Sequence, residues 1–279
     1  MWSGCPCVKW SRRSNVSAPF ASSPTCPQQR LHRPPPDSLL SLPPTARDTM
    51  TIQNNIQSIR TRLDAACRRS GRDPDQVRLV AVSKTKPAGQ IEEAARAGQQ
   101  LFGESYVQEF TDKREEVKLP VTWHFIGHLQ SNKVKYLRGK VSMIHSVDRL
   151  SLAEEINRQW QKIGETVDIL LQVNLAKEAS KSGATADAAE ELARRLAALP
   201  HVHLRGLMTL PPYCENPQDV RPYFSQLRHL SERIAALNLP NVSMTELSMG
   251  MSHDFEVAVE EGATLVRIGT AIFGEREYR

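Results

Sequence analysis

The sequence has little cysteine, and most of what it has lies near one end. Three of the five cysteines fall in the first 49 of the 279 residues, which leaves Cys67 and Cys214 for the rest. No C-x-x-C pair and no His/Cys spacing typical of a zinc site occurs. These absences exclude a disulfide-stapled fold and a structural zinc site, so we expect a cytoplasmic protein without a metal.

Long apolar runs and a strongly charged folded region are also missing. No stretch is long enough to span a bilayer, and the apolar run of a secretory signal is absent. The formal charge is +5, but six basic and two acidic residues within 1–49 account for +4 of it. The remainder is nearly neutral, and we therefore expect neither nucleic-acid binding nor membrane attachment.

Residues 1–49 differ in composition from the rest. They hold nine of the 18 prolines and show no apolar periodicity. Such a segment buries too little surface to offset its ordering entropy and is predicted to be a disordered extension. Its basic, acid-poor composition fits a transit peptide or upstream sequence read from a start codon assigned too early. We favour the second interpretation, with Met50 as the true start, because no amphipathic helical period runs through it.

Residues 50–279 predict one domain of alternating strands and helices. Eight short runs have the length and composition of buried strands, and apolar residues at helical spacing lie between them. The predicted strands begin at Leu79, Leu101, Val121, Val141, Val167, Val202, Ser243 and Thr264. Eight such units in about 230 residues indicate an α/β fold, a single (β/α)8 TIM-type barrel, with an extra N-terminal helix over residues 51–70. An open doubly wound sheet is the alternative, and the lack of G-x-G-x-x-G after the first strand weighs against it.

Lys84 follows the first predicted strand directly. Barrels bind their ligands at the carboxyl ends of the strands, so Lys84 is expected at the mouth of the barrel. A desolvated lysine there is a nucleophile toward carbonyl groups. A solvated lysine without a special role is the alternative, and it is the commoner case for such a residue considered alone.

Small and hydroxylated residues follow the last two predicted strands, in the stretches 246–254 and 269–270. In barrels these two loops often bind phosphate together. Ordinary helix capping by Ser252 or Asp254 is the alternative, and the two roles can coexist. Several other strand ends carry polar residues or methionine, namely Glu104, Ser105, His124, His128, Ser146, Asp148, Asn174, Met208 and Thr209. We include Met208 in the candidate site and interpret the two histidines as packing or surface residues.

Arg267 lies inside the eighth predicted strand, on the same face as Leu265. A permanent charge in so apolar a run needs a partner, either a neighbouring acidic residue or a ligand at the barrel mouth. A reactive lysine, a phosphate loop and a fixed donor together suggest pyridoxal 5'-phosphate (PLP). Its aldehyde would meet Lys84, and its ring nitrogen would meet Arg267.

Six motifs occur in order across residues 51–276: V-A-V-S-K-T-K-P, F-G-E-S-Y-V-Q-E, W-H-F-I-G-H-L-Q-S-N-K, L-M-T-L, E-L-S-M-G-M-S-x-D-F and V-R-I-G-T-A-I-F-G. In this respect the chain resembles the pyridoxal phosphate homeostasis protein family, which is similar in fold to the barrel domain of alanine racemase. The resemblance implies a Schiff base between PLP and Lys84, with Arg267 at the pyridine nitrogen. It implies phosphate contacts from Ser248, Met249, Gly250, Gly269 and Thr270. Ser105 stands where the family usually has Asn, which puts a cofactor contact from that position in doubt.

Three functions are compatible with these features. The first is a non-catalytic carrier of PLP, with apo forms of PLP-dependent enzymes as recipients; the others are an amino-acid racemase and a barrel for another phosphorylated metabolite. Racemases of this fold use a second domain that supplies a tyrosine base. We expect none after Arg279, and we do not expect Tyr278 to replace it. The first function is favoured, for a monomer in which Lys86 and Lys181 are accessory lysines at most.

Overall fold

The structure of the protein is a computed structural model that describes residues 51–176 and 182–275. The predictions made for residues 1–49, for Lys181 and for Tyr278 concern positions outside these ranges. The folded part is described by itself below.

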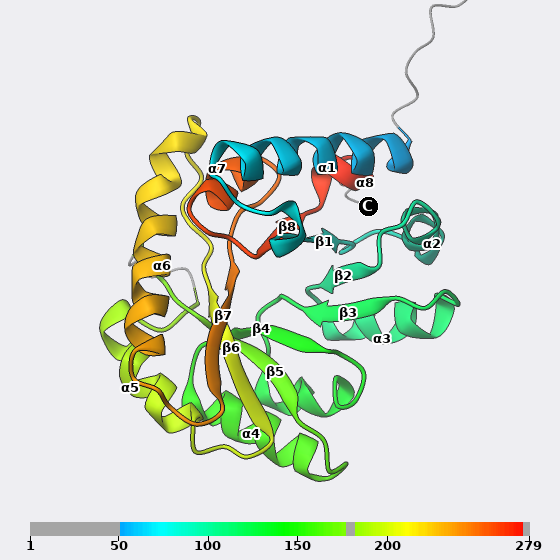
Figure 1. Ribbon diagram of the computed structural model, residues 1–279. Coiled ribbons are helices and arrows are strands. Elements are labelled where there is room, and N and C mark those ends of the chain that lie inside the picture. Colours follow the sequence, from blue (N-terminus) through cyan, green and yellow to red (C-terminus); the bar gives the residue numbers. More distant parts are fainter. Residues whose placement is uncertain (1–50, 177–181, 276–279) are drawn as a thin grey trace, which may run out of the picture. The chain divides into compact units, whose positions relative to one another are not determined.

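Eight parallel strands close into a barrel in chain order (Figure 1). They are β1 Arg78–Val82, β2 Leu101–Glu104, β3 Thr122–Phe125, β4 Met143–Val147, β5 Val167–Gln172, β6 Val202–Met208, β7 Val242–Ser248 and β8 Leu265–Ile268. The last strand pairs with the first, with Leu265 opposite Arg78 and Ile268 opposite Ala81. The predicted (β/α)8 barrel is confirmed, and each predicted strand begins within two residues of the observed one.

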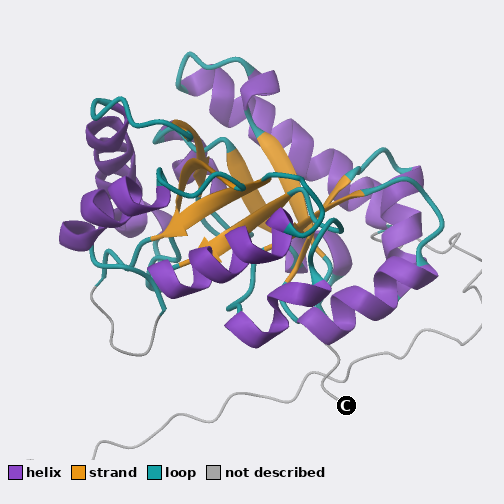
Figure 2. Cartoon of the chain, turned by 90° about the horizontal axis from the view of Figure 1, so that it is seen from below, coloured by secondary structure: helices purple, strands orange, loops and turns teal. Residues whose placement is uncertain are grey.

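Helices surround this barrel, as the view in Figure 2 shows. The α-helices are α1 Ile52–Arg69, α2 Ala88–Arg96, α3 Val107–Glu116, α4 Leu150–Gln161, α5 Ala186–Leu196, α6 Arg221–Ala235, α7 Phe255–Glu260 and α8 Thr270–Phe273. Short 3-10 helices are η1 Pro74–Gln76, η2 Ser131–Tyr136 and η3 Pro217–Val220. The helical segment between β3 and β4 is the 3-10 helix η2 rather than an α-helix. Only Val134 is buried within η2, and a segment without an apolar stripe has little to stabilise an α-helix.

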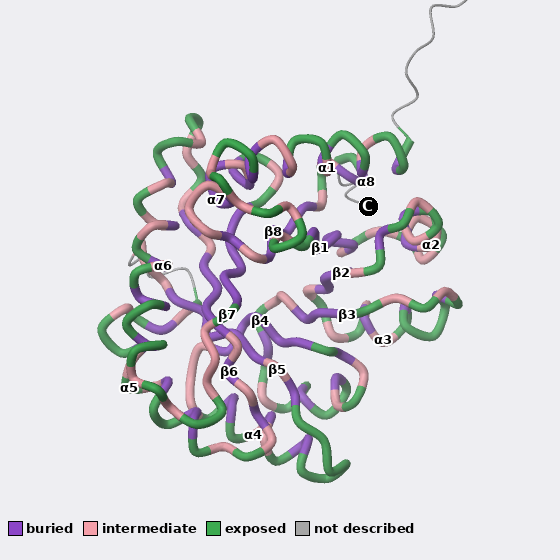
Figure 3. Tube along the Cα trace, viewed as in Figure 1, coloured by how far each residue is buried: buried purple, intermediate pink, exposed green. Residues whose placement is uncertain are grey.

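The strands are buried, whereas the helices expose their outer sides to solvent (Figure 3). Val266 and Ile268 of β8 belong to the large core between strands and helices. Leu265 belongs instead to a small cluster inside the barrel, together with Val80, Met143, Leu170 and Met208. The period-2 alternation therefore divides β8 between two cores, and Arg267 shares the inward face of β8 with Leu265.

Helix α1 lies beside α2, α7 and α8, outside β8 and β1 (Figure 1). Its N-cap is Thr51, whose hydroxyl accepts from the Asn54 N–H at 3.2 Å. Apolar residues at helical spacing, from Ile52 to Leu63, form its buried face. Asn55 Nδ2 donates to the carbonyl of Ile272 at 2.8 Å. Because α8 has only 4 residues, α1 completes the helical layer at this side of the barrel.

Candidate functional site

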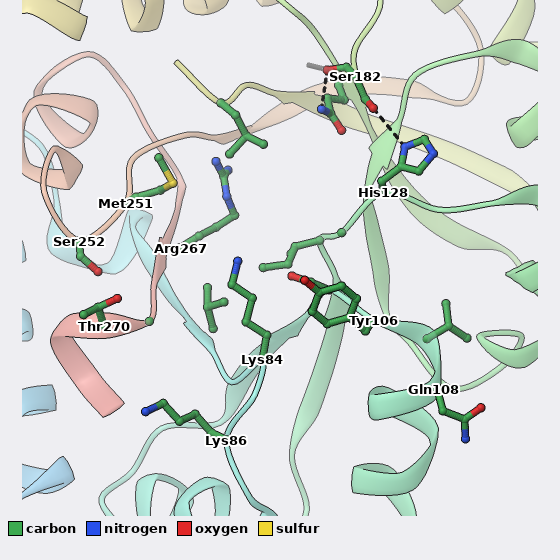
Figure 4. A pocket seen from close by; sticks show the side chains of 18 of the residues that line it. Lys84, Lys86, Tyr106, Gln108, His128, Ser182, Met251, Ser252, Arg267 and Thr270 are labelled. Carbon is green, nitrogen blue, oxygen red and sulfur yellow. Dashed lines mark hydrogen bonds between the residues drawn. The ribbon is translucent and has the colours of Figure 1, made fainter. Parts of the chain in front are cut away.

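A cavity of about 950 Å³ lies at the carboxyl ends of the strands. Its lining includes Lys84 after β1, Arg267 on β8, and Gly269 and Thr270 after β8. No aspartate or glutamate is among the described residues that line it. Figure 4 shows the Lys84 side chain pointing into this space, between Arg267 and Tyr106. The described lining of the cavity therefore combines a primary amine, a guanidinium and hydroxyl groups.

The turn that carries Lys84 is held on both sides. Ser83 Oγ donates to Glu104 Oε1 at 2.6 Å, and the Ser83 carbonyl accepts from Lys113 Nζ at 2.6 Å. Thr85 has a φ of 65°, an uncommon value for a β-branched residue, and its N–H donates to Glu109 Oε1. Both chain neighbours of Lys84 are thus bonded to side chains from β2 and α3.

Lys113 joins the acidic residues of this network. Its ammonium donates to Glu104 at 2.8 Å and to Glu109 at 2.6 Å, and its side chain is only 7% exposed. Burial raises the pKa of Glu104, and the adjacent Lys113 charge opposes that shift. Glu104 Oε2 is buried without a hydrogen-bond partner. An ion pair this deep is expensive to disrupt, because each charge would lose its compensation.

Arg267 is held by neutral groups. Its Nη1 donates to Ser248 Oγ at 2.5 Å and its Nη2 to the Thr209 carbonyl at 2.8 Å. Burial lowers the pKa of Arg267 to about 10, so the side chain is still a cation at neutral pH. We predicted a partner for this charge, and the partners are a hydroxyl and a carbonyl on β7 and just after β6.

A chain of buried hydrogen bonds continues from Ser248 into the barrel. His145 Nδ1 lies 2.9 Å from Ser248 Oγ, and His145 Nε2 lies 2.8 Å from His124 Nδ1. A guanidinium can only donate, so Ser248 Oγ accepts from Arg267 and also bonds His145 Nδ1. Burial lowers the pKa of His145 well below its ordinary value, and burial, with Arg78 nearby, lowers that of His124 to about 3.

The loops after β7 and β8 meet at one side of the cavity. Figure 4 shows the hydroxyl groups of Ser252 and Thr270 next to one another there. The Ala271 N–H donates to Ser252 Oγ at 3.5 Å. Asp254 is the N-cap of α7, and its carboxylate accepts from the Met251 N–H at 2.6 Å. The Asp254 carboxylate thus secures the turn before α7, and Ser252 lines the cavity, so phosphate binding by this loop stays a prediction.

The residues predicted for the cofactor site fall into two groups. Four of them line the cavity: Lys84, Arg267, Gly269 and Thr270. The other four, Met208, Ser248, Met249 and Gly250, are not among the described lining residues. Ser248 accepts a hydrogen bond from Arg267, which lines the cavity, and Met249 is buried in the core between strands and helices. Contacts from all eight residues to a cofactor stay predictions.

The remaining candidates are placed as follows. Lys86 borders the cavity, but its ammonium donates to the carbonyls of Phe273 and Glu275 at 2.9 and 2.8 Å. Ser105 also borders the cavity. Of the histidines taken for packing or surface residues, His124 is buried and His128 borders the cavity, where it meets Ser182 at 3.2 Å.

Sequence reasoning missed two residues that shape the site. His145 lies within the apolar β4, where a polar ring on the inward face was a usable signal. Lys113 gave no signal, because α3 is rich in charged residues and reads as a solvated helix. Its burial depends on the end of β2 and the turn after β1, neither of which adjoins it in the sequence.

The chain is similar in sequence to a family of known proteins. A family model described as the alanine racemase N-terminal domain matches residues 48–277. The pyridoxal phosphate homeostasis protein of Aquifex aeolicus is 48% identical over 230 residues, covering 82% of this chain and 100% of the relative. That of Escherichia coli is 44% identical over 231 residues, covering 81% and 97%. The chain belongs to the pyridoxal phosphate homeostasis protein family.

A solved structure of the same kind supports the membership. PipY of Synechococcus elongatus, in a structure with PLP bound, is 36% identical with a TM-score of 0.71, covering 80% of this chain and 100% of PipY. The resemblance that the motifs indicated is confirmed at the level of the family. No helix in the described part of the chain is long and apolar enough to cross a membrane. The described residues also contain no cluster of three or more His, Cys, Asp or Glu suited to a metal ion.

Proposed function

We propose that this protein binds PLP as a Schiff base on Lys84 and serves PLP homeostasis in the cytoplasm, holding the cofactor and passing it to apo enzymes. The observation that carries the proposal is the pairing of Lys84 with the buried Arg267 in one cavity whose described lining residues include no aspartate or glutamate. The donor set fits a phosphorylated aldehyde with a basic ring nitrogen. The names of the relatives and the PLP-bound PipY support the same cofactor.

Each part of the ligand has a matching group in the cavity. When bound, PLP supplies an aldehyde that condenses with primary amines and a ring that withdraws electrons. Lys84 would hold the aldehyde carbon. Ser252, Gly269 and Thr270, all on the cavity wall, would receive the phosphate. Arg267 would donate to the ring nitrogen and, as a cation, disfavour a proton there.

A carrier without appreciable amino-acid turnover is the role we favour over a racemase. A ring nitrogen that stays unprotonated withdraws electrons poorly, so carbanion chemistry gains little help. A racemase compensates with two positioned bases, each of which typically contributes 10²–10⁴-fold. Lys84 would be one such base. A racemase would need a second, and Tyr106, which also lines the cavity, is the residue to test for that role.

Spectroscopy with chemical trapping tests the proposal. The purified protein with PLP should absorb visible light, and borohydride reduction followed by peptide mass spectrometry should place the label on Lys84. A label on another lysine, or no label, would refute the site.

The carrier role has a separate test. The loaded protein is incubated with L- and D-alanine in deuterated water, and α-deuterium is followed by NMR. We expect negligible incorporation. Rapid incorporation that Tyr106→Phe abolishes would favour the racemase, and the same exchange lost only in Lys84→Ala would point to a single-base enzyme.

A further inference from the structure

An ionic network of Lys113, Glu104 and Glu109 bonds the turn that carries Lys84. Lys113 offers three N–H donors, and the three acceptors are the Ser83 carbonyl, Glu104 and Glu109. Glu109 in turn accepts from the Thr85 N–H. The buried Lys113 ammonium therefore bonds Ser83 directly and is linked to Thr85 through Glu109.

The turn needs such support because of its backbone. Thr85 adopts a φ of 65°, in the left-handed region that costs non-glycine residues conformational free energy. The bond to Glu109 opposes relaxation of Thr85 toward an ordinary conformation. Such a relaxation would rotate the preceding peptide and redirect Lys84, whose side chain points into the cavity (Figure 4).

We propose that Lys113 and Glu109 are positioning residues for Lys84, which fix Ser83 and Thr85 so that the Lys84 amine stays aimed into the cavity and releases PLP slowly. This inference rests on the proposed Schiff base at Lys84. It assigns no contact with the cofactor to either residue. The consequence is that PLP retention depends on a network in β2 and α3 as well as on the residues lining the cavity.

The decisive variants are at Glu109, because its side chain is 23% exposed and its loss leaves the buried pair of Lys113 and Glu104 in place. Glu109→Ala removes the acceptor of the Thr85 N–H, whereas Glu109→Gln keeps an acceptor oxygen and removes the charge. Glu116→Ala is the matched control, since Glu116 is an exposed glutamate at the end of the same helix. Release is followed as loss of visible absorbance after dilution of the PLP-loaded proteins.

We expect Glu109→Ala to release PLP about tenfold faster than the wild type, the loss typical of one charge-assisted hydrogen bond. Glu109→Gln should fall between the two, and Glu116→Ala should match the wild type. Lys113→Met should also accelerate release, and adding Glu109→Ala to it should give little more. A merely structural role would lower the melting temperature of the apo-protein without separating the Ala and Gln variants in release rate.

Two results would overturn the inference: release from Glu109→Ala at the wild-type rate, or equal acceleration in Glu116→Ala. Should Lys113→Met fail to fold, the Glu109 variants still decide. Borohydride labelling of the wild type separates this inference from the function on which it rests. A label on Lys84 together with unchanged release from Glu109→Ala rejects the positioning role alone.

Discussion

The two sides of the cavity hold their key residues by opposite means. Around Lys84 the neighbouring backbone is tied by a cluster of full charges, with Lys113 between two glutamates. Around Arg267 the partners are neutral, beginning with the hydroxyl of Ser248. The first arrangement fixes the backbone on both sides of Lys84. The second fixes a side chain and leaves its positive charge uncompensated by these partners.

This difference follows from what each residue has to do. Lys84 is proposed to make and break a bond, so its support comes from contacts to Ser83 and Thr85. Arg267 is proposed to keep its charge and direction, and a carboxylate partner would cancel the charge that faces the ligand. Neutral hydrogen-bonding groups are suited to this task because they orient a cation without neutralising it.

Removing the amine of the charged side should have the largest effect. Lys84→Ala is expected to abolish the visible absorbance and the borohydride label, because the amine proposed to hold the PLP aldehyde, in the turn after β1, is then missing. Lys86→Ala is the control and should retain both, since the Lys86 ammonium is bonded to the carbonyls of Phe273 and Glu275. Equal occupancy in the two variants, measured by absorbance after gel filtration, would remove the distinction between the lysines.

Breaking the neutral side should cost stability as well as affinity. Ser248→Ala removes one of the two buried hydrogen-bond partners of Arg267 and one of the two of His145, and we expect the free energy of unfolding to fall by about 1–3 kcal/mol. Denaturant titration measures this change. The control is Ser243→Ala, because the Ser243 hydroxyl is buried and makes no hydrogen bond, so its removal should be neutral or stabilising. Similar losses of unfolding free energy in the two variants would argue against a stabilising role for the hydrogen bonds of Ser248.

The histidines of the neutral side predict a dependence of stability on pH. The pKa of His124 is lowered to about 3 in the folded protein, against 6.5 as its ordinary value. Between these values the unfolded chain binds a proton that the folded chain does not, so stability is complete above pH 6.5 and is lost as the pH falls. His124→Gln should flatten this slope by up to about 1.4 kcal/mol per pH unit. Urea titrations at several pH values would detect it, and His229→Gln, at an exposed position, should leave the slope unchanged.

The smallest effect is expected outside both sides of the cavity. Deleting residues 1–49 should change neither PLP retention nor the melting temperature, because a segment with nine prolines and no apolar periodicity is expected to bury little surface. Calorimetry and absorbance of the two proteins check this. A large drop in melting temperature would show that the extension contributes to the folded domain.

The sequence predicted the elements that depend on local periodicity. Eight strands were found from apolar runs, and Lys84 and Arg267 stood out because a charge at the end of such a run, or within it, requires an explanation. Contacts between distant residues gave no such signal. Lys113 and Ser83 are separated by 30 positions, and the pairing of β1 with β2 and the packing of α3 bring them together.

The position of α1 has a consequence for the order of folding during synthesis. The apolar face of this helix is made early, but α7 and α8, against which it packs, are made last. The bond from Asn55 to Ile272 spans 217 positions. Until the segments that form β8 and α8 have been made, α1 lacks α7 and α8 as packing partners, and the two edge strands of the unclosed sheet are unpaired on their outer sides. Closure is therefore a late, non-local event, and the nascent chain carries exposed apolar surface for most of its synthesis.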